Sequence, residues 1–184
     1  MIVLMTVTLL TALGTAVTLA TIAETAIAAN YRDAAEALYA AEAAVEFATQ
    51  EVADVPDWSD LIAESGRSAF VDGPAGGSRT VGAGTLDLTD ATRDLNATAS
   101  PAWVLYAFGP FQDLVPSGRS RSPIYVVVWV ADRSEVPADE TYAPEALSIL
   151  GQAYGTRGSR RTVETIVVRE SDAGVRARSW REWR

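Results

Sequence analysis

The sequence predicts an α+β fold, in which a long N-terminal helix packs on a C-terminal antiparallel β-sheet. Residues 1–23 contain no charged side chain, and residues 24–55 contain no glycine or proline while their apolar residues recur at helical spacing. From residue 102 onward, short runs rich in β-branched and aromatic residues are separated by glycine-containing turns. A chain whose helix and strands occupy separate stretches is typical of the α+β class.

Residues 1–23 form the first half of the predicted helix and are apolar enough to span a membrane. About 20 apolar residues cross the ~30 Å hydrocarbon core of a bilayer. A cleaved signal peptide has a basic start and a shorter apolar core, whereas this segment has no basic residue and continues directly into a second helical segment. We therefore predict an uncleaved, single-pass anchor. Its threonines and the small residues around Gly14 favour a helix that also packs against other helices.

Residues 24–55 form the second, amphipathic half of the same helix. Large apolar residues recur every seven positions, at Tyr31, Leu38, Val45 and Val52, and a second apolar series follows three residues later. This average spacing of 3.5 residues predicts that these four side chains pack on the sheet. Pro56 ends the helix, because the residue before a proline is pushed out of the α conformation. One continuous helix is expected from residue 1 to about residue 54.

The remaining residues, 56–184, form the predicted globular domain, which begins with an irregular loop region over residues 56–101. Within this region, Trp58, Leu61 and Ile62 indicate a short helical turn. Residues 71–85 are rich in glycine but match neither the phosphate-binding P-loop nor the dinucleotide-binding spacing. They are therefore interpreted as a flexible surface connector.

Residues 102–184 carry the predicted antiparallel sheet. The candidate strands span residues 102–108, 123–131, 146–154, 162–168 and 175–183. The second of these is almost continuously apolar, which predicts a central strand that is covered by other elements. The last three are joined by short turns that contain glycine, and this pattern is typical of an antiparallel meander.

The composition argues against several classes of function. The chain has 184 residues, a net charge of −9, no cysteine and no histidine. Without cysteine the chain can form no disulfide, thiolate zinc site or cysteine nucleophile, and without histidine it can form no Ser-His-Asp triad. A chain this acidic lacks the basic surface that nucleic acid requires. We predict a protein that is not an enzyme, uses no cofactor and binds no nucleic acid.

An acidic loop follows the central strand and provides the weak metal candidates of this sequence, Asp132, Glu135, Asp139 and Glu140. Oxygen-rich loops can hold Ca²⁺, but this spacing does not fit an EF-hand. The favoured interpretation is a solvated loop, so no metal site is predicted.

The two ends of the chain resemble the PilX-like minor pilins of the type IV pilin superfamily. At the N-terminus, the apolar segment is followed by an Asn-x-Arg-Asp block and an Ala-Glu-Ala block, carried here by Asn30, Arg32, Asp33, Ala41 and Glu42. At the C-terminus, the stretch ALSILGQAYGTRGSRRTVETIVVRE and the closing VRARSWREWR are similar to the last strands of that family. The resemblance covers about half of the chain and leaves the middle unmatched.

This resemblance implies a pilin-like fold and a structural role. The helix would lie in the bacterial inner membrane with the globular domain in the periplasm, and would later enter an extracellular pilus. The implied contacts with other pilin subunits involve Leu10, Leu13, Gly14 and Val17. A minor pilin of this kind would prime pilus assembly or sit at the tip, where it displays its domain for adhesion or aggregation. A tip adhesin is a further candidate partner.

Two departures from the family pattern concern the start of the helix. Type IV prepilins carry a short basic leader that ends in glycine, whereas counting along the pattern places Met1 a few residues inside the mature helix. Mature major pilins have a glutamate at position five, where this sequence has Met5, and the first carboxylate is Glu24. Either the register is displaced or this glutamate is missing, as in some tip-located pseudopilins.

Two alternative functions stay open at the level of the sequence. The first is a pseudopilin of a type II secretion system, although the large tip pseudopilin of such systems is longer and contains cysteines. The second is a signal-anchored periplasmic binding domain. This second alternative predicts a concave pocket with converging polar groups in the second half of the chain.

Overall fold

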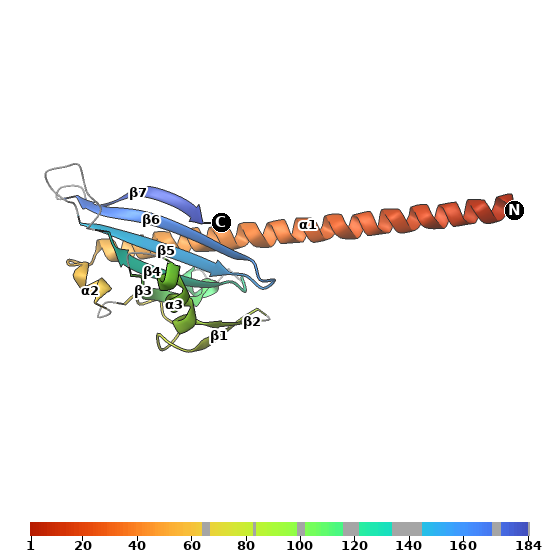
Figure 1. The fold of residues 1–184 in the computed structure, drawn as a ribbon. Coiled ribbons are helices and arrows are strands. Elements are labelled where there is room, and N and C mark those ends of the chain that lie inside the picture. Colours follow the sequence, from red (N-terminus) through yellow and green to blue (C-terminus); the bar gives the residue numbers. More distant parts are fainter. Residues whose placement is uncertain are drawn as a thin grey trace.

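A long helix projects from a small α+β domain in the computed structural model of the chain (Figure 1). The structure describes residues 1–63, 67–82, 84–98, 102–115, 122–133, 145–170 and 174–183. The elements follow one another as α1 (Ile2–Ala53), α2 (Ser59–Ile62), β1 (Ser78–Val81), β2 (Gly84–Asp87), α3 (Leu88–Thr98), β3 (Val104–Pro110), α4 (Phe111–Leu114), β4 (Tyr125–Asp132), β5 (Ala146–Tyr154), β6 (Arg160–Glu170) and β7 (Gly174–Trp183). The predicted α+β class is thereby confirmed.

Helix α1 is continuous over 52 residues. At 1.5 Å per residue it is about 78 Å long. It ends just before Pro56, and the indole N–H of Trp58 donates a hydrogen bond of 2.8 Å to the carbonyl of Val52 in the last helical turn. The buried indole of Trp58 therefore fixes the direction in which the chain leaves the helix.

The main sheet has the order β3-β4-β5-β6-β7, with every neighbouring pair antiparallel, so it is a meander of consecutive strands. The second half of α1 covers one face of this sheet. Helix α3 and the β1-β2 hairpin cover part of the other face, where a second apolar cluster includes Leu88, Trp103 and Trp129. Strand β4 is buried along its length up to Ala131, because it lies between β3 and β5 and both of its faces are covered.

Small residues bring α1 close to the sheet. The buried residues of the helix are mostly alanines; they are Ala37, Ala40, Ala41, Ala44, Val45, Ala48 and Val52. On the sheet, a Cβ atom added to Gly151 of β5 would lie 2.6 Å from Cγ2 of Val45 and 2.9 Å from the carbonyl oxygen of Ala41. Alanine on the helix and glycine on the strand therefore let the two backbones approach more closely than larger side chains would permit.

The four residues predicted to pack on the sheet do not behave alike. Val45 and Val52 lie in the core, and Leu38 is partly buried against it. The prediction for Tyr31 is wrong, because its side chain is 78% exposed. An α-helix has 3.6 residues per turn, so a seven-residue series drifts by about 20° per heptad. The first buried residue of α1 is Ala37, so Tyr31 also lies beyond the edge of the domain.

Residues 56–101 are more regular than predicted. They contain α2, the β1-β2 hairpin and the 11-residue helix α3. The side chain of Asp87 caps α3, since its Oδ1 accepts hydrogen bonds from the backbone N–H groups of Thr89 at 2.9 Å and Asp90 at 3.0 Å. An aspartate at this position satisfies N–H groups that have no partner within the helix.

The glycine-rich stretch is tied to the sheet through Arg79. Its guanidinium pairs with Asp72 at 2.9 Å and donates to the carbonyl of Pro74 at 2.8 Å. The hydroxyl of Tyr125 on β4 donates to the other oxygen of Asp72 at 2.9 Å. The predicted connector is therefore a loop and hairpin that are held against the sheet.

Candidate functional site

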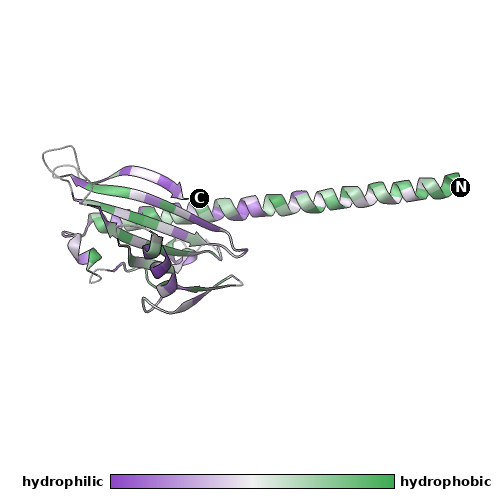
Figure 2. Cartoon of the chain, in the orientation of Figure 1, coloured by the Kyte–Doolittle hydropathy of each residue, from purple (hydrophilic) through white to green (hydrophobic). Residues whose placement is uncertain are grey.

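The projecting half of α1 is an uncovered apolar surface. Figure 2 shows that hydrophobic residues cover most of it. Every residue from Met1 to Ala28 is exposed. In the part of the chain that the structure describes, α1 is the one helix with the length and apolar character needed to cross a membrane. An apolar surface of this size does not remain in contact with water in a stable protein.

The four residues implied to contact other subunits lie within this uncovered half. Leu10, Leu13 and Val17 are exposed, and a Cβ atom added to Gly14 would meet no other atom within 4 Å. The structure therefore brings none of these residues into contact with the globular domain. All four are available to lipid or to another helix.

The threonines of this half form hydrogen bonds within their own helix. The hydroxyls of Thr11, Thr15 and Thr18 each donate to the carbonyl four residues earlier, at 2.8, 2.9 and 2.9 Å. The same bond is made by Thr6, Thr21 and Thr25. Because these hydroxyls have acceptors, they can enter an apolar environment without the cost of an unsatisfied polar group.

The N-terminal part of α1 is similar to a known protein family. Residues 1–46 match the family model described as PilX N-terminal. The chain has a PilX-like pilin N-terminus. The match supports a pilin related to type IV pili and confirms the N-terminal part of the resemblance found in the sequence. It covers the projecting half of α1 and the first turns that pack on the sheet. No curated protein and no solved structure matches the chain.

The PilX-like helix shares an open groove with the last strand of the sheet. The groove lies between α1 and β7 and has a volume of about 650 Å³. Glu42, Glu46 and Tyr39 line it from the helix, while Arg178 and Trp180 line it from the strand. Strand β7 is the last strand of the sheet and is exposed over most of its length.

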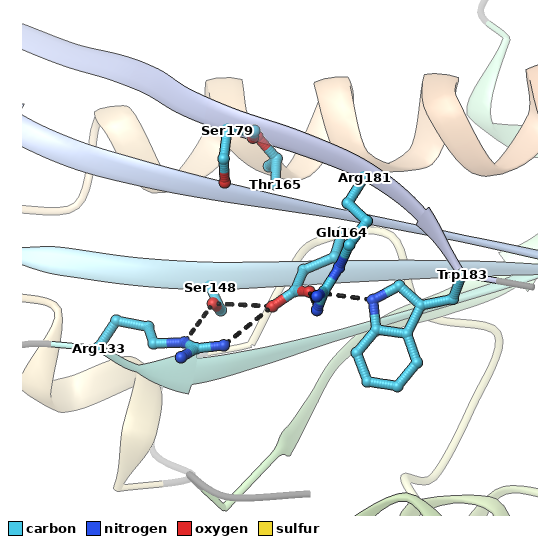
Figure 3. A network of polar contacts seen from close by, with 7 residues as sticks. All are labelled: Arg133, Ser148, Glu164, Thr165, Ser179, Arg181 and Trp183. Atoms are coloured by element: carbon cyan, nitrogen blue, oxygen red, sulfur yellow. Dashed lines mark hydrogen bonds and ion pairs between the residues drawn. The ribbon is translucent and has the colours of Figure 1, made fainter. Parts of the chain in front are cut away.

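Glu164 of β6 holds β7 in place on the opposite face of the sheet (Figure 3). Glu164 is only 3% exposed. One carboxylate oxygen accepts a hydrogen bond of 3.0 Å from the indole N–H of Trp183 and pairs with Arg181, both on β7. The other oxygen accepts bonds of 3.3 Å from Ser148 and from Arg133. Glu164 therefore joins β7 to β5 and to the end of β4.

The pKa of Glu164 lies below its ordinary value. Burial alone would raise this pKa, but the hydrogen bonds from Trp183 and Arg181 and the positive charges of Arg181 and Arg133 outweigh burial. The carboxylate is therefore ionised at neutral pH. Its polar neighbours satisfy one another, so the cluster stabilises the sheet and does not form the converging polar pocket that a binding domain would need.

The acidic loop that provides the weak metal candidates begins at the end of β4. Asp132 is the last residue of β4, while Glu135, Asp139 and Glu140 lie outside the described residues. Asp132 borders a surface hollow with Asp57 and Glu145, and Glu145 pairs with Arg169 at 3.3 Å. Within the described ranges, no group of three acidic residues is arranged to hold a metal ion.

The sequence analysis missed both Glu164 and the groove. A signal for Glu164 was present, because it is a lone carboxylate in the apolar strand pattern TVETIVV. A buried charge in such a strand requires a partner. The groove left no comparable signal, since its walls come from residues 39–49 and residues 165–180, which are far apart in the chain.

Proposed function

We propose that this chain is a minor pilin, a structural subunit of a type IV pilus, and not an enzyme. The observation that carries the proposal is the PilX-like helix itself, of which one half projects uncovered while the other half is built into a five-stranded domain. Such a helix can leave one apolar environment and enter another while the domain remains folded.

The physical role of the projecting half follows from what can cover it. In the bacterial inner membrane, lipid surrounds residues 1–23, and the globular domain lies in the periplasm. In a pilus, the helices of other pilin subunits replace the lipid. Leu10, Leu13 and Val17 then pack against neighbouring helices, and Gly14 permits their close approach.

The globular domain would be displayed on the pilus that the helix anchors. A subunit that primes assembly is positioned at or near the tip. There the domain would contact other cells, surfaces or a tip adhesin. This arrangement requires no chemistry from the domain, only a stable fold and an exposed surface.

Replacing Leu13 with aspartate tests the proposed role of the helix. A carboxylate near the centre of a membrane-spanning helix costs about 3 kcal/mol on insertion. In a strain that lacks the native gene, Leu13→Asp is expected to leave surface pili and cell aggregation at the level of the deletion strain. Leu13→Ile, the matched control, should restore both. Full restoration by Leu13→Asp would contradict the proposal.

A further inference from the structure

The groove between α1 and β7 has a largely apolar lining that is open to solvent in the described part of the chain. Ala43 and Val45 are among its lining residues, together with two large aromatic side chains, Tyr39 and Trp180. Tyr39 is 68% exposed and Trp180 is 56% exposed. Tyr39 lies on α1, which packs in the core, and Trp180 lies on β7, which pairs with β6. The groove therefore exists before anything binds to it.

The charges of the groove favour a cation. Glu42 and Glu46 lie on the helix wall, and neither forms an ion pair with another described residue; Glu46 accepts a hydrogen bond only from Gln50, at 3.0 Å. Arg178 on the strand wall is the one cation among the lining residues. Two carboxylates facing one guanidinium leave the groove negative. It therefore fits a partner that presents apolar side chains next to a positive charge.

Residues 27–32 of α1 have this combination. Ile27 is 68% exposed and Tyr31 is 78% exposed. They are four residues apart and therefore lie on one face of the helix. Arg32 follows directly, is exposed, and forms no ion pair with the described residues. This segment lies just outside the domain, and among the described residues of its own subunit none covers Ile27, Tyr31 or Arg32.

A subunit cannot place this segment in its own groove. Tyr31 and Ala43 are 12 residues apart on one straight helix, which separates them by about 18 Å. The segment and the groove are also two different surfaces of the chain, so a contact between them is not self-complementary. If they bind each other, they must do so between subunits, and the contact is head-to-tail. Contacts of this kind build open chains and filaments.

We propose that the α1-β7 groove binds residues 27–32 of a second copy of this chain. Ile27 and Tyr31 enter between Tyr39 and Trp180, and Arg32 pairs with Glu42 and Glu46. This is a helix bound in a groove, with the apolar face giving affinity and the ion pairs giving register. The inference rests on the proposed function, because that function anchors every copy in the same orientation in the inner membrane, where two copies can meet before assembly.

Cysteine cross-linking tests the contact directly, because the chain contains no native cysteine. The full-length double variant Tyr31→Cys/Ala43→Cys is expressed in membranes and treated with a mild oxidant. Its two cysteines cannot bridge within one chain, since a disulfide requires Cα atoms less than about 7 Å apart. A ladder of dimers, trimers and larger species is expected on a non-reducing gel. Each single variant should give no species larger than a dimer.

The matched control is Tyr31→Cys/Arg93→Cys, which places the second cysteine on the exposed side of α3, away from the groove. It should give no ladder. Arg32→Glu added to the groove pair should reduce the ladder about fivefold, and Arg32→Glu with Glu42→Arg should restore it. A groove pair that cross-links no better than the control would overturn the proposal, as would a ladder that is insensitive to these charges.

The cross-linking result and the presence of the chain in pili can fail independently of each other. If the chain is found in pili but the groove pair gives no ladder, the groove proposal fails and the proposed function stands. If the ladder forms but the chain never enters pili, the groove is confirmed as a contact between copies and the pilin role is contradicted.

Discussion

Replacing Gly151 with valine is expected to lower the free energy of unfolding by about 3 kcal/mol, at the upper end of the usual cost of overpacking. Even a single Cβ atom at this position would lie 2.6 Å from Val45 and 2.9 Å from the backbone of Ala41. Backbone atoms of a helix cannot rotate out of the way as a side chain can. Valine must therefore push α1 away from β5.

The measurement is denaturant unfolding of the full chain in detergent, with tryptophan fluorescence as the readout. Gly84→Val is the matched control, because a Cβ atom there would lie 3.6 Å from its nearest neighbour, an ordinary contact. The Gly84 variant should unfold close to the wild-type midpoint. Equal midpoints for the Gly151 variant and the wild type would contradict the packing described for α1.

Replacing Glu164 with alanine is expected to cost about 3 kcal/mol of stability at neutral pH, the lower end for breaking a buried ion pair. The lower end applies because Arg181 keeps 61% of its side chain exposed and recovers hydration. Ser148 and Arg133 are more enclosed: Ser148 loses its acceptor, and Arg133 keeps only its hydrogen bond to the Ser148 hydroxyl. Glu164→Gln keeps the shape and one acceptor oxygen, so its loss should be smaller, about 1–2 kcal/mol.

The contribution of Glu164 should also depend on pH. Its pKa is lower in the folded protein than the ordinary value of 4.5. Its ionised form therefore stabilises the fold above that pH, and the contribution is lost as the pH falls through the folded pKa. The difference in unfolding free energy between wild type and Glu164→Gln should be constant near neutral pH and shrink below about pH 4.5. A difference that grows on acidification would contradict the assigned role of Glu164.

The main sheet and the long helix could be predicted because their sequence signals are local. The predicted strand at residues 146–154 coincides with β5, and the uninterrupted helical pattern coincides with α1. Helix α3 and the β1-β2 hairpin depend more on tertiary contacts. A Cβ atom added to Gly82, which has a φ of 58°, would lie 2.7 Å from the backbone of Thr156. No local pattern reveals that this turn must fit against the connection between β5 and β6.

The candidate site could be predicted in part for the same reason. The apolar projecting half of α1 is visible as a continuous run in the sequence. The exposure of Tyr31 could not be predicted, because it depends on where the sheet ends along the helix. The groove requires the position of β7 relative to α1, which the order of residues does not contain.

The most direct test of the central claim is whether the full chain enters pili. A tagged copy is expressed from its native site, and pili are sheared from the cells and separated from membranes. The tagged chain should be found in the sheared fraction of piliated cells and be lost from it in a strain without the main pilus subunit. A resident inner-membrane protein serves as the control and should stay with the membranes. A tagged chain that remains entirely in the membrane fraction of piliated cells would contradict the account.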